Sequence, residues 1–248
     1  MEKRFFSARE RVLSEATGEG GIGTLGEKLV HKVLKYCIEP NEAYHERALF
    51  GSVADIFDGE RVCEIQTRSF IKLLPKLRKF LKSYPVTVVY PLIRERKIRY
   101  FNRETGEISP PRKSPRRGRL SDALVEISAI REFVGKEGFS LKIVILDAEE
   151  FRKKGGIARG RRARENKLEI IPTDIVGSLD FSLAEDYAAL LPDGLADTFV
   201  AEEFYRVLGL RGRGAYFALD FLREMGFIKQ IGKRGRAFLY EKVEINEN

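Results

Sequence analysis

The chain has 248 residues, of which 43% are hydrophobic, so it can build a core in one large domain or in two of ordinary size. Its formal net charge of +8 favours a polyanionic partner, most simply nucleic acid. The two cysteines and two histidines argue against structural zinc, and no apolar run approaches the roughly 18 residues of a membrane span. The N-terminus also lacks the apolar core of a signal peptide, so we expect a cytoplasmic protein with no membrane partner.

The N-terminal region is predicted to hold two helices separated by a glycine-rich loop. Residues 1–16 form the first, polar helix, and residues 21–26 match G-x-G-x-x-G letter for letter. A dinucleotide site requires an apolar strand before that motif, whereas the preceding residues are charged, so we reject this interpretation. The second helix is predicted to begin at Thr24, because Thr24 and Glu27 form a capping box before apolar residues at helical spacing.

Residues 51–67, GSVADIFDGERVCEIQT, are predicted to form a β-hairpin. Two runs of strand-forming residues flank Asp58-Gly59, a dipeptide typical of a two-residue type I′ turn. Such a turn would pair Phe57 with Glu60 and fix the register of the two strands.

The predicted hairpin gathers polar side chains on one face. Side chains alternate between the faces of a strand, so Asp55, Glu64 and Gln66 would share one face. Asp55 and Glu64 would be diagonal neighbours, with Cα atoms roughly 7–8 Å apart, and their carboxylates could bind one magnesium ion. The alternative is a polar face that is merely solvated. The other face, which would turn toward the core, carries Ile56, Cys63 and Ile65.

An aspartate, a Glu-x-Gln sequence on the next strand and a glutamate on the preceding helix together resemble the core of PD-(D/E)XK (restriction-endonuclease-like) nucleases. The resemblance covers residues 23–92. It implies an α/β fold with an αβββαβ core and a mixed sheet, in which Asp55, Glu64 and Glu27 hold Mg2+ or Mn2+ that activates water against a phosphodiester. Glu27 could instead act only as the helix cap. His31, one turn later, could contact substrate, although we expect it to pack.

Two residues depart from the pattern of that family. Ala54 stands where the name-giving proline would be, and Gln66 replaces the usual lysine. Gln66 could orient water or phosphate by hydrogen bonding, but it has no positive charge to contribute. Arg68 or Lys72, just downstream, could supply the missing cation.

The elements that follow the hairpin complete the order of the suspected core. A strand at 45–50 precedes the hairpin, an amphipathic helix at 69–84 follows it with its regular part beginning near Pro75, and an apolar strand spans 86–92. Helix, three strands, helix and strand is the αβββαβ order. Further strands are predicted at 97–102, 141–146 and 167–171, and further helices at 122–134 and 149–154.

Two basic loops interrupt the second half of this region. Residues 110–119 read PPRKSPRRGR, and residues 155–167 read GGIARGRRARENK. Basic runs are often simply solvated. Beside a candidate phosphodiesterase site we interpret them as phosphate contacts, made by Arg116, Arg117, Arg161 and Arg162.

The C-terminal residues form a separate pattern. A Pro-Asp-Gly turn at 192–194 suggests a boundary between a nuclease-like domain, 1–190, and a second domain, 191–248. Helices at 198–208 and 213–225, with Phe217 among the residues facing inward, precede a hairpin whose tip is 232–235. This order resembles a winged helix, which can bind DNA or protein. The resemblance implies that Arg211, Arg213 and Tyr216 approach base edges, while Lys233, Arg234 and Arg236 contact phosphates.

The sequence therefore predicts a Mg2+- or Mn2+-dependent DNA endonuclease acting on duplex or branched DNA, with a homodimer as a possible assembly. Two other functions stay open. The chain could be a DNA-binding protein with a catalytically silent nuclease fold, for which Gln66 is the best support. It could also be an interaction module of a defence or repair complex.

Overall fold

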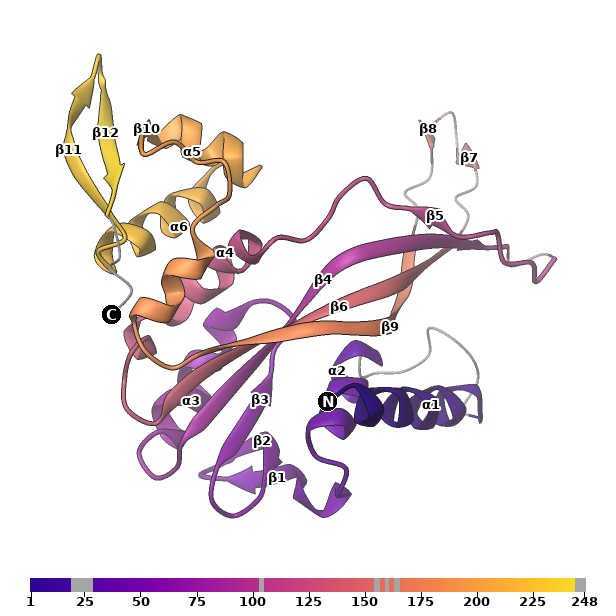
Figure 1. Ribbon diagram of the computed structural model, residues 1–248. Helices are drawn as coiled ribbons and strands as arrows, with labels where there is room; N and C mark the ends of the chain where they lie inside the picture. The colour runs from indigo at the N-terminus through magenta and orange to yellow at the C-terminus, as the bar shows by residue number, and fades with distance from the viewer. Residues whose placement is uncertain (19–28, 103–104, 154–156, 159–160, 163–165, 244–248) are drawn as a thin grey trace. The chain divides into compact units, whose positions relative to one another are not determined.

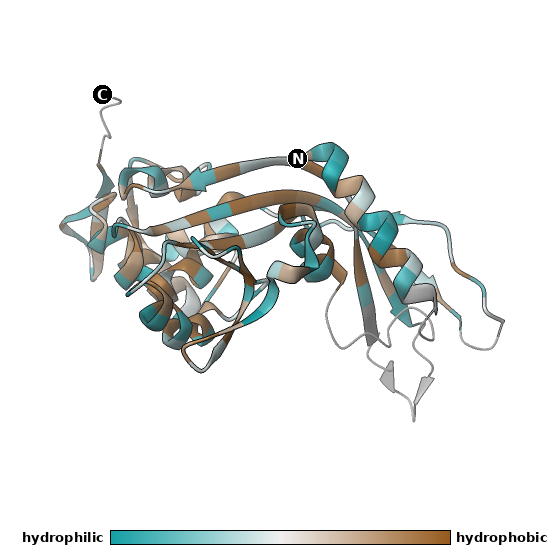
Figure 2. Cartoon of the chain, turned by 90° about the horizontal axis from the view of Figure 1, so that it is seen from below, coloured by the Kyte–Doolittle hydropathy of each residue, from teal (hydrophilic) through white to brown (hydrophobic). Residues whose placement is uncertain are grey.

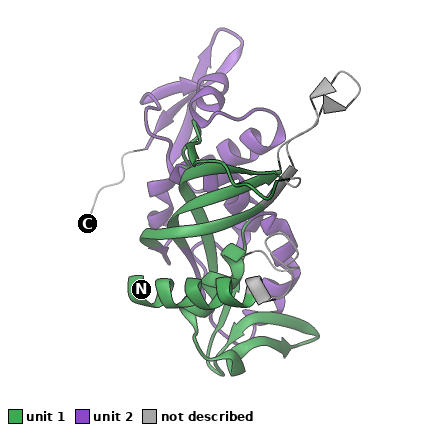
Figure 3. Ribbon diagram, turned by 90° about the vertical axis from the view of Figure 1, so that its right-hand side faces the viewer, with its two compact units in different colours: residues 1–67, 88–118, 143–179 green, residues 68–87, 119–142, 180–248 purple. Residues whose placement is uncertain are grey.

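The computed structural model describes residues 1–18, 29–102, 105–153, 157–158, 161–162 and 166–243 (Figure 1). The chain forms two compact units, each assembled from several segments (Figure 3). The first comprises residues 1–67, 88–118 and 143–179, and the second comprises 68–87, 119–142 and 180–248. The predicted boundary between residues 190 and 191 falls inside the second unit.

The first unit combines two helices with most of a mixed sheet. The sheet order is β1-β2-β3-β4-β6-β9, and β5 pairs with β4. The strands β4, β6 and β9 also contribute a few residues to the second unit. The elements are α1 (Glu2–Gly18), α2 (Leu29–Ile38), β1 (His45–Leu49), β2 (Ser52–Phe57), β3 (Val62–Ile65), β4 (Val86–Phe101), β5 (Arg112–Lys113), β6 (Phe139–Lys153), β7 (Ile157–Ala158), β8 (Arg161–Arg162) and β9 (Asn166–Phe181).

The helices of this unit pack on the apolar side of the hairpin. Phe5 of α1 and Val33 of α2 are fully buried in one cluster with Ile56 and Ile65, against which Cys63 packs. The prediction that Ile56, Cys63 and Ile65 face the core is therefore confirmed. Figure 2 shows long hydrophobic stretches along the strands, in keeping with their burial.

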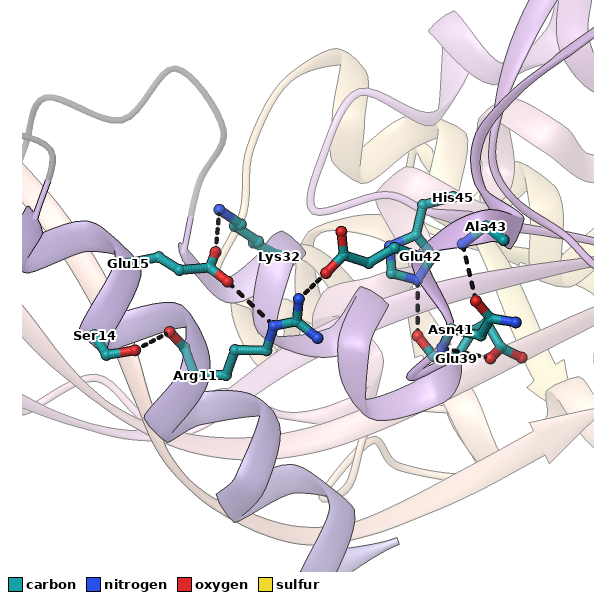
Figure 4. A network of polar contacts seen from close by, with 9 residues as sticks. All are labelled: Arg11, Ser14, Glu15, Lys32, Glu39, Asn41, Glu42, Ala43 and His45. Carbon is teal, nitrogen blue, oxygen red and sulfur yellow. Dashed lines mark hydrogen bonds and ion pairs between the residues drawn. The ribbon is translucent and has the colours of Figure 1, made fainter.

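A polar network fastens α1 to its neighbours (Figure 4). The Arg11 guanidinium forms ion pairs with Glu15 on its own helix and with Glu42 in the 3-10 turn before β1. Glu15 also binds Lys32 of α2 at 2.9 Å, and the Lys32 hydrogen bond is the largest cause of the lowered pKa of the Glu15 carboxyl. The network thus holds the helix pair in register over the sheet.

The turn of the β2–β3 hairpin differs from the prediction. The strands pair Phe57 with Val62 rather than with Glu60, so the loop has four residues and the register is shifted by two. The Asp58 carboxylate accepts the backbone N–H groups of Glu60 and Arg61 at 3.0 and 2.9 Å, and only Gly59 of the central dipeptide has a positive φ. This side-chain-capped loop replaces the type I′ turn. A shift of two leaves every side chain on its predicted face.

Two predictions about the sheet are wrong. The separate strands at 86–92 and 97–102 are one strand, β4, and the predicted helix at 149–154 is the end of strand β6. Arg94 of β4 pairs with Asp147 of β6, and Arg99 pairs with Glu149. These cross-strand ion pairs keep both polar segments extended. The paired numbers rise together, so the two strands run in the same direction.

The second unit is mainly helical with a three-stranded sheet in the order β10-β12-β11. A 3-10 turn before Leu74 opens the helix predicted near Pro75, which is confirmed. The predicted helix at 122–134 is broken into short 3-10 and α pieces around α4. The regular elements are α3 (Leu74–Phe80), α4 (Leu124–Ile127), β10 (Thr198–Val200), α5 (Ala201–Leu208), α6 (Arg213–Glu224), β11 (Ile228–Arg234) and β12 (Ala237–Lys242).

The helix predicted from residue 198 begins three residues later. Residues 198–200 form β10, which pairs with β12 because Phe199 is fully buried opposite Tyr240. Glu203 then accepts the Val200 N–H at 2.8 Å and caps α5 at its start. Gly209, with φ 71°, ends the helix, and Arg119 donates to its last two carbonyls at 2.7 Å. No described helix is long and apolar enough to cross a membrane.

Candidate functional site

The hairpin places two carboxylates side by side. Asp55 of β2 and Glu64 of β3 occupy facing positions, one step along the ladder from the pair Ile56–Cys63. The Asp55 N–H donates to Glu64 Oε1 at 3.3 Å, and Asp55 Oδ2 accepts the Ile65 N–H at 2.7 Å. Glu64 is only 1% exposed and the Asp55 side chain 14% exposed. The predicted proximity of these two acids is confirmed, and they are closer than the predicted diagonal.

A histidine from α2 joins this pair. His31 Nε2 lies 3.1 Å from Asp55 Oδ2, and the His31 side chain is 18% exposed. The sequence prediction of a packing role for His31 therefore missed its contact with a candidate site residue. Its position one helical turn after Glu27, on the helix that precedes the strands, was the available signal.

The structure supports the other predicted site residues less completely than Asp55 and Glu64. Glu27 lies outside the described residues. Gln66 directly follows β3, two residues beyond Glu64, and its N–H donates to Val89 of β4 at 2.9 Å. This backbone bond fixes the end of the hairpin against the sheet. Arg68 and Lys72 belong to the second compact unit, so their role as a substitute cation stays a prediction.

The donor set suits a hard cation only in part. Among the described residues, no group of three or more His, Cys, Asp or Glu side chains is arranged to hold a metal ion. Asp55 and Glu64 supply adjacent carboxylates, and magnesium is commonly bound by one or two carboxylates completed by water or phosphate oxygens. The pair therefore fits that ion as a partial ligand set.

The first basic loop contributes both exposed and paired arginines. Arg116 and Arg117 are both largely exposed, and Arg117 forms a 2.6 Å ion pair with Glu95 of β4. In the second loop, Arg161 and Arg162 form β8, paired with β7, and their side chains lie outside the described residues. Phosphate binding by these four residues stays a prediction.

The start of α6 presents an exposed surface that is both basic and aromatic. Arg211 and Arg213 are exposed, Tyr216 is 54% exposed and Phe217 45% exposed. The prediction that Phe217 faces inward is wrong. The inner face of the helix consists of Ala215, Ala218, Leu219, Phe221 and Leu222, and position 217 lies just beyond the edge of that face, one turn before Phe221.

The tip of the β11–β12 hairpin holds the three predicted phosphate contacts. Lys233 lies over the Phe238 ring, 5.4 Å from its centroid, and Arg236 is exposed after Gly235. Arg234 forms an ion pair with Glu203 of α5 at 2.9 Å. The backbone hydrogen bond from Val200 is the largest cause of the lowered pKa of Glu203, and Arg234 adds to it. Arg234 is thus already engaged in fastening the hairpin to α5.

The comparisons with known proteins identify a family whose description names no function. Residues 28–182 match the family described as "Domain of unknown function (DUF8091)". An "Uncharacterized protein" of Treponema pallidum (strain Nichols) is 31% identical over 231 residues, which cover 92% of this chain and 90% of the relative. No solved structure is significantly similar to the chain. The match spans the helix with His31, the carboxylate hairpin and both basic loops, and the chain belongs to the DUF8091 family.

Proposed function

We propose that the chain is a metal-dependent DNA endonuclease that hydrolyses phosphodiester bonds at the β2–β3 hairpin. One observation carries this proposal: Asp55 and Glu64 lie side by side on neighbouring strands, linked by the 3.3 Å bond from the Asp55 N–H to Glu64. The element order supports it, because a helix, three strands, a helix and a strand follow one another from α2 to β4.

Two adjacent carboxylates beside a polyanionic substrate need a counter-charge. They repel each other and the phosphate backbone unless a cation lies between them. Asp55 and Glu64 would hold Mg2+ or Mn2+, with Glu27 as the third acid that the family resemblance implies. When bound, the metal would supply a Lewis acid that lowers the pKa of bound water and offsets the negative charge that develops on the phosphoryl oxygens.

The surrounding residues orient this pair. The Ile65 N–H and His31 both contact Asp55 Oδ2, so they fix the plane of that carboxylate. Gln66, which directly follows β3 two residues after Glu64, would position the attacking water or a phosphate oxygen by hydrogen bonding. It adds no positive charge, so charge neutralisation depends on the metal and on arginines of the basic loops.

A second candidate function rests on the same residue. Because Gln66 stands where the family usually has lysine, the chain could be a DNA-binding protein whose nuclease fold is catalytically silent. The exposed Arg211, Arg213 and Tyr216 would serve either function. An interaction module for another protein would lack the strong salt dependence that phosphate contacts impose on DNA affinity.

The decisive experiment measures nicking of plasmid and branched DNA in Mg2+ or Mn2+ with variants that preserve shape. We expect the wild type to nick the DNA. The nicking rate of the double variant Asp55→Asn, Glu64→Gln should be lower by about a hundredfold or more, since metal stabilisation of the transition state amounts to several kcal/mol. The matched control is Asp58→Asn, which alters a carboxylate of the same hairpin that accepts backbone N–H groups in the loop.

The outcomes separate the candidates. Loss of nicking in the double variant, with folding and DNA affinity retained, would assign the chemistry to the hairpin. Tight DNA binding without cleavage by any variant would favour the silent fold. Equal cleavage by the wild type and the double variant would refute the assignment of these residues.

A further inference from the structure

Helix α6 carries two aromatic rings on its solvent side. Tyr216 is 54% and Phe217 45% exposed, and their rings meet edge to face with centroids 5.8 Å apart. Folding gains nothing from leaving two large rings in water, and adjacent exposed rings form a patch that a partner can cover. The inner face of the same helix is fully packed, so the rings are not needed to hold it in place.

The charge around the two rings is positive. Arg213 is exposed one turn before Tyr216 and Arg211 is exposed just before the helix begins, and among the described residues neither arginine forms an ion pair. The acids farther along α6 are neutralised, because Asp220 binds Arg131 and Arg223, and Glu224 binds Arg131. This patch, formed by Arg211, Arg213, Tyr216 and Phe217, therefore suits an anionic partner with flat, apolar groups.

We propose that the patch binds unpaired bases of nucleic acid, with the two rings stacking on bases and the two arginines contacting the flanking phosphates. Base edges in a duplex are read chiefly by side chains that donate and accept hydrogen bonds, and a phenylalanine offers none. Stacking instead requires an exposed aromatic face with cations alongside, and it tolerates any base. The patch thus selects single-stranded or branched substrates over blunt duplex. This inference rests on the proposed function, from which it takes DNA as the ligand. It adds that the substrate is single-stranded or branched DNA.

The test measures binding, independently of cleavage. Fluorescence anisotropy with a single-stranded oligonucleotide, a forked duplex and a blunt duplex of the same sequence should show the first two bound about tenfold more tightly than the third by the wild type. The double variant Tyr216→Ala, Phe217→Ala should lose about tenfold in affinity for unpaired DNA, which removes the preference, and much less in affinity for duplex. The matched control is Leu183→Ala, which removes an apolar side chain that is 57% exposed in the same unit.

A spectroscopic probe reports the stacking itself. The chain has no tryptophan, so Phe217→Trp introduces a single indole at the patch. We expect single-stranded and forked DNA to quench its fluorescence, and blunt duplex to leave it nearly unchanged.

Each outcome decides the proposal. Preference for unpaired DNA that disappears in the double alanine variant would support it. Equal affinity for all three ligands, or an alanine variant that retains the preference, would overturn it while leaving the endonuclease proposal intact. Absence of binding to any of the three DNAs would overturn both this inference and the DNA-binding part of the proposed function.

Discussion

The carboxylate hairpin and the aromatic patch of α6 depart from the ordinary distribution of side chains in opposite ways. At the hairpin, Glu64 is an acid withdrawn from water, whereas on α6 Tyr216 and Phe217 are large rings left in water. Buried charges and exposed aromatic groups are the informative exceptions in a folded protein. In both regions neighbouring residues provide the stability: backbone N–H groups support the acids, and a packed inner face supports the rings. Function can therefore be tested apart from folding at each place.

The largest expected effect separates the two faces of α6. Phe221 is fully buried on the inner side, so Phe221→Ala should lower the free energy of unfolding by about 3–5 kcal/mol through lost contacts and a cavity. Phe217→Ala, on the outer side of the same helix, should change it by less than about 0.5 kcal/mol. Chemical denaturation of both variants makes the comparison. Similar losses would show that Phe217 contributes to folding, and would contradict its assignment to a binding patch.

The next effect concerns the hairpin acids. A divalent ion that binds only the folded state stabilises it by about 2.7 kcal/mol when present at 100 times its dissociation constant. We expect saturating Mn2+ to raise the melting temperature of the wild type and of Asp58→Asn, but not of Asp55→Asn. An equal shift in all three proteins would place the ion elsewhere.

Much of the fold follows from local patterns in the sequence. The alternation of polar and apolar residues in 51–67 predicts the two hairpin strands and their buried face. The predicted face is correct although the predicted register is wrong, because a shift of two residues leaves each side chain on the same face. The register itself depends on the Asp58 side chain capping the loop. The extension of β6 to Lys153 was not predictable locally, because Glu149 meets Arg99, which lies 50 residues away.

The candidate site, like the fold, could be predicted from the sequence only in part. The proximity of Asp55 to Glu64 follows from strand pairing and could be predicted. The contact of His31 with Asp55 depends on how α2 lies on the sheet, for which the spacing of His31 from Glu27 in the sequence is only a partial signal. The exposure of Phe217 could not be recognised from spacing alone, because Phe221, four residues later on the same side of the helix, is fully buried.

A smaller effect tests how the acids of α6 are neutralised. Arg131 Nη1 binds Asp220 at 2.9 Å and Glu224 at 2.7 Å, so Arg131→Met should lower stability by about 1–2 kcal/mol at neutral pH. The Arg131 hydrogen bond, aided by Arg223, lowers the pKa of Asp220 in the folded state. The stability that ionised Asp220 contributes is thus complete above its unfolded pKa of about 3.9, and it is lost as the pH falls through the lower pKa of the folded state.

The stability gap between wild type and Arg131→Met should therefore narrow below about pH 4. Denaturation curves at a series of pH values measure the gap. The control is Arg78→Met, which removes an exposed pair with Glu132 and should cost less than about 1 kcal/mol. A gap that stays constant into strong acid would show that Arg131 acts through packing rather than through its charge.

The smallest effect distinguishes a buried polar group that has partners from one that lacks them. The Tyr187 ring packs against Phe181 and Phe221, and its buried hydroxyl has no hydrogen-bond partner among the described residues. Burial also raises the pKa of this phenol. Because an unsatisfied hydroxyl costs about 1–3 kcal/mol, Tyr187→Phe should raise the free energy of unfolding by about 1 kcal/mol, whereas Tyr216→Phe on the exposed patch should leave it nearly unchanged. A loss of stability in Tyr187→Phe would mean that the hydroxyl has a partner such as water, and that this site resembles Glu64, whose carboxylate accepts a backbone N–H.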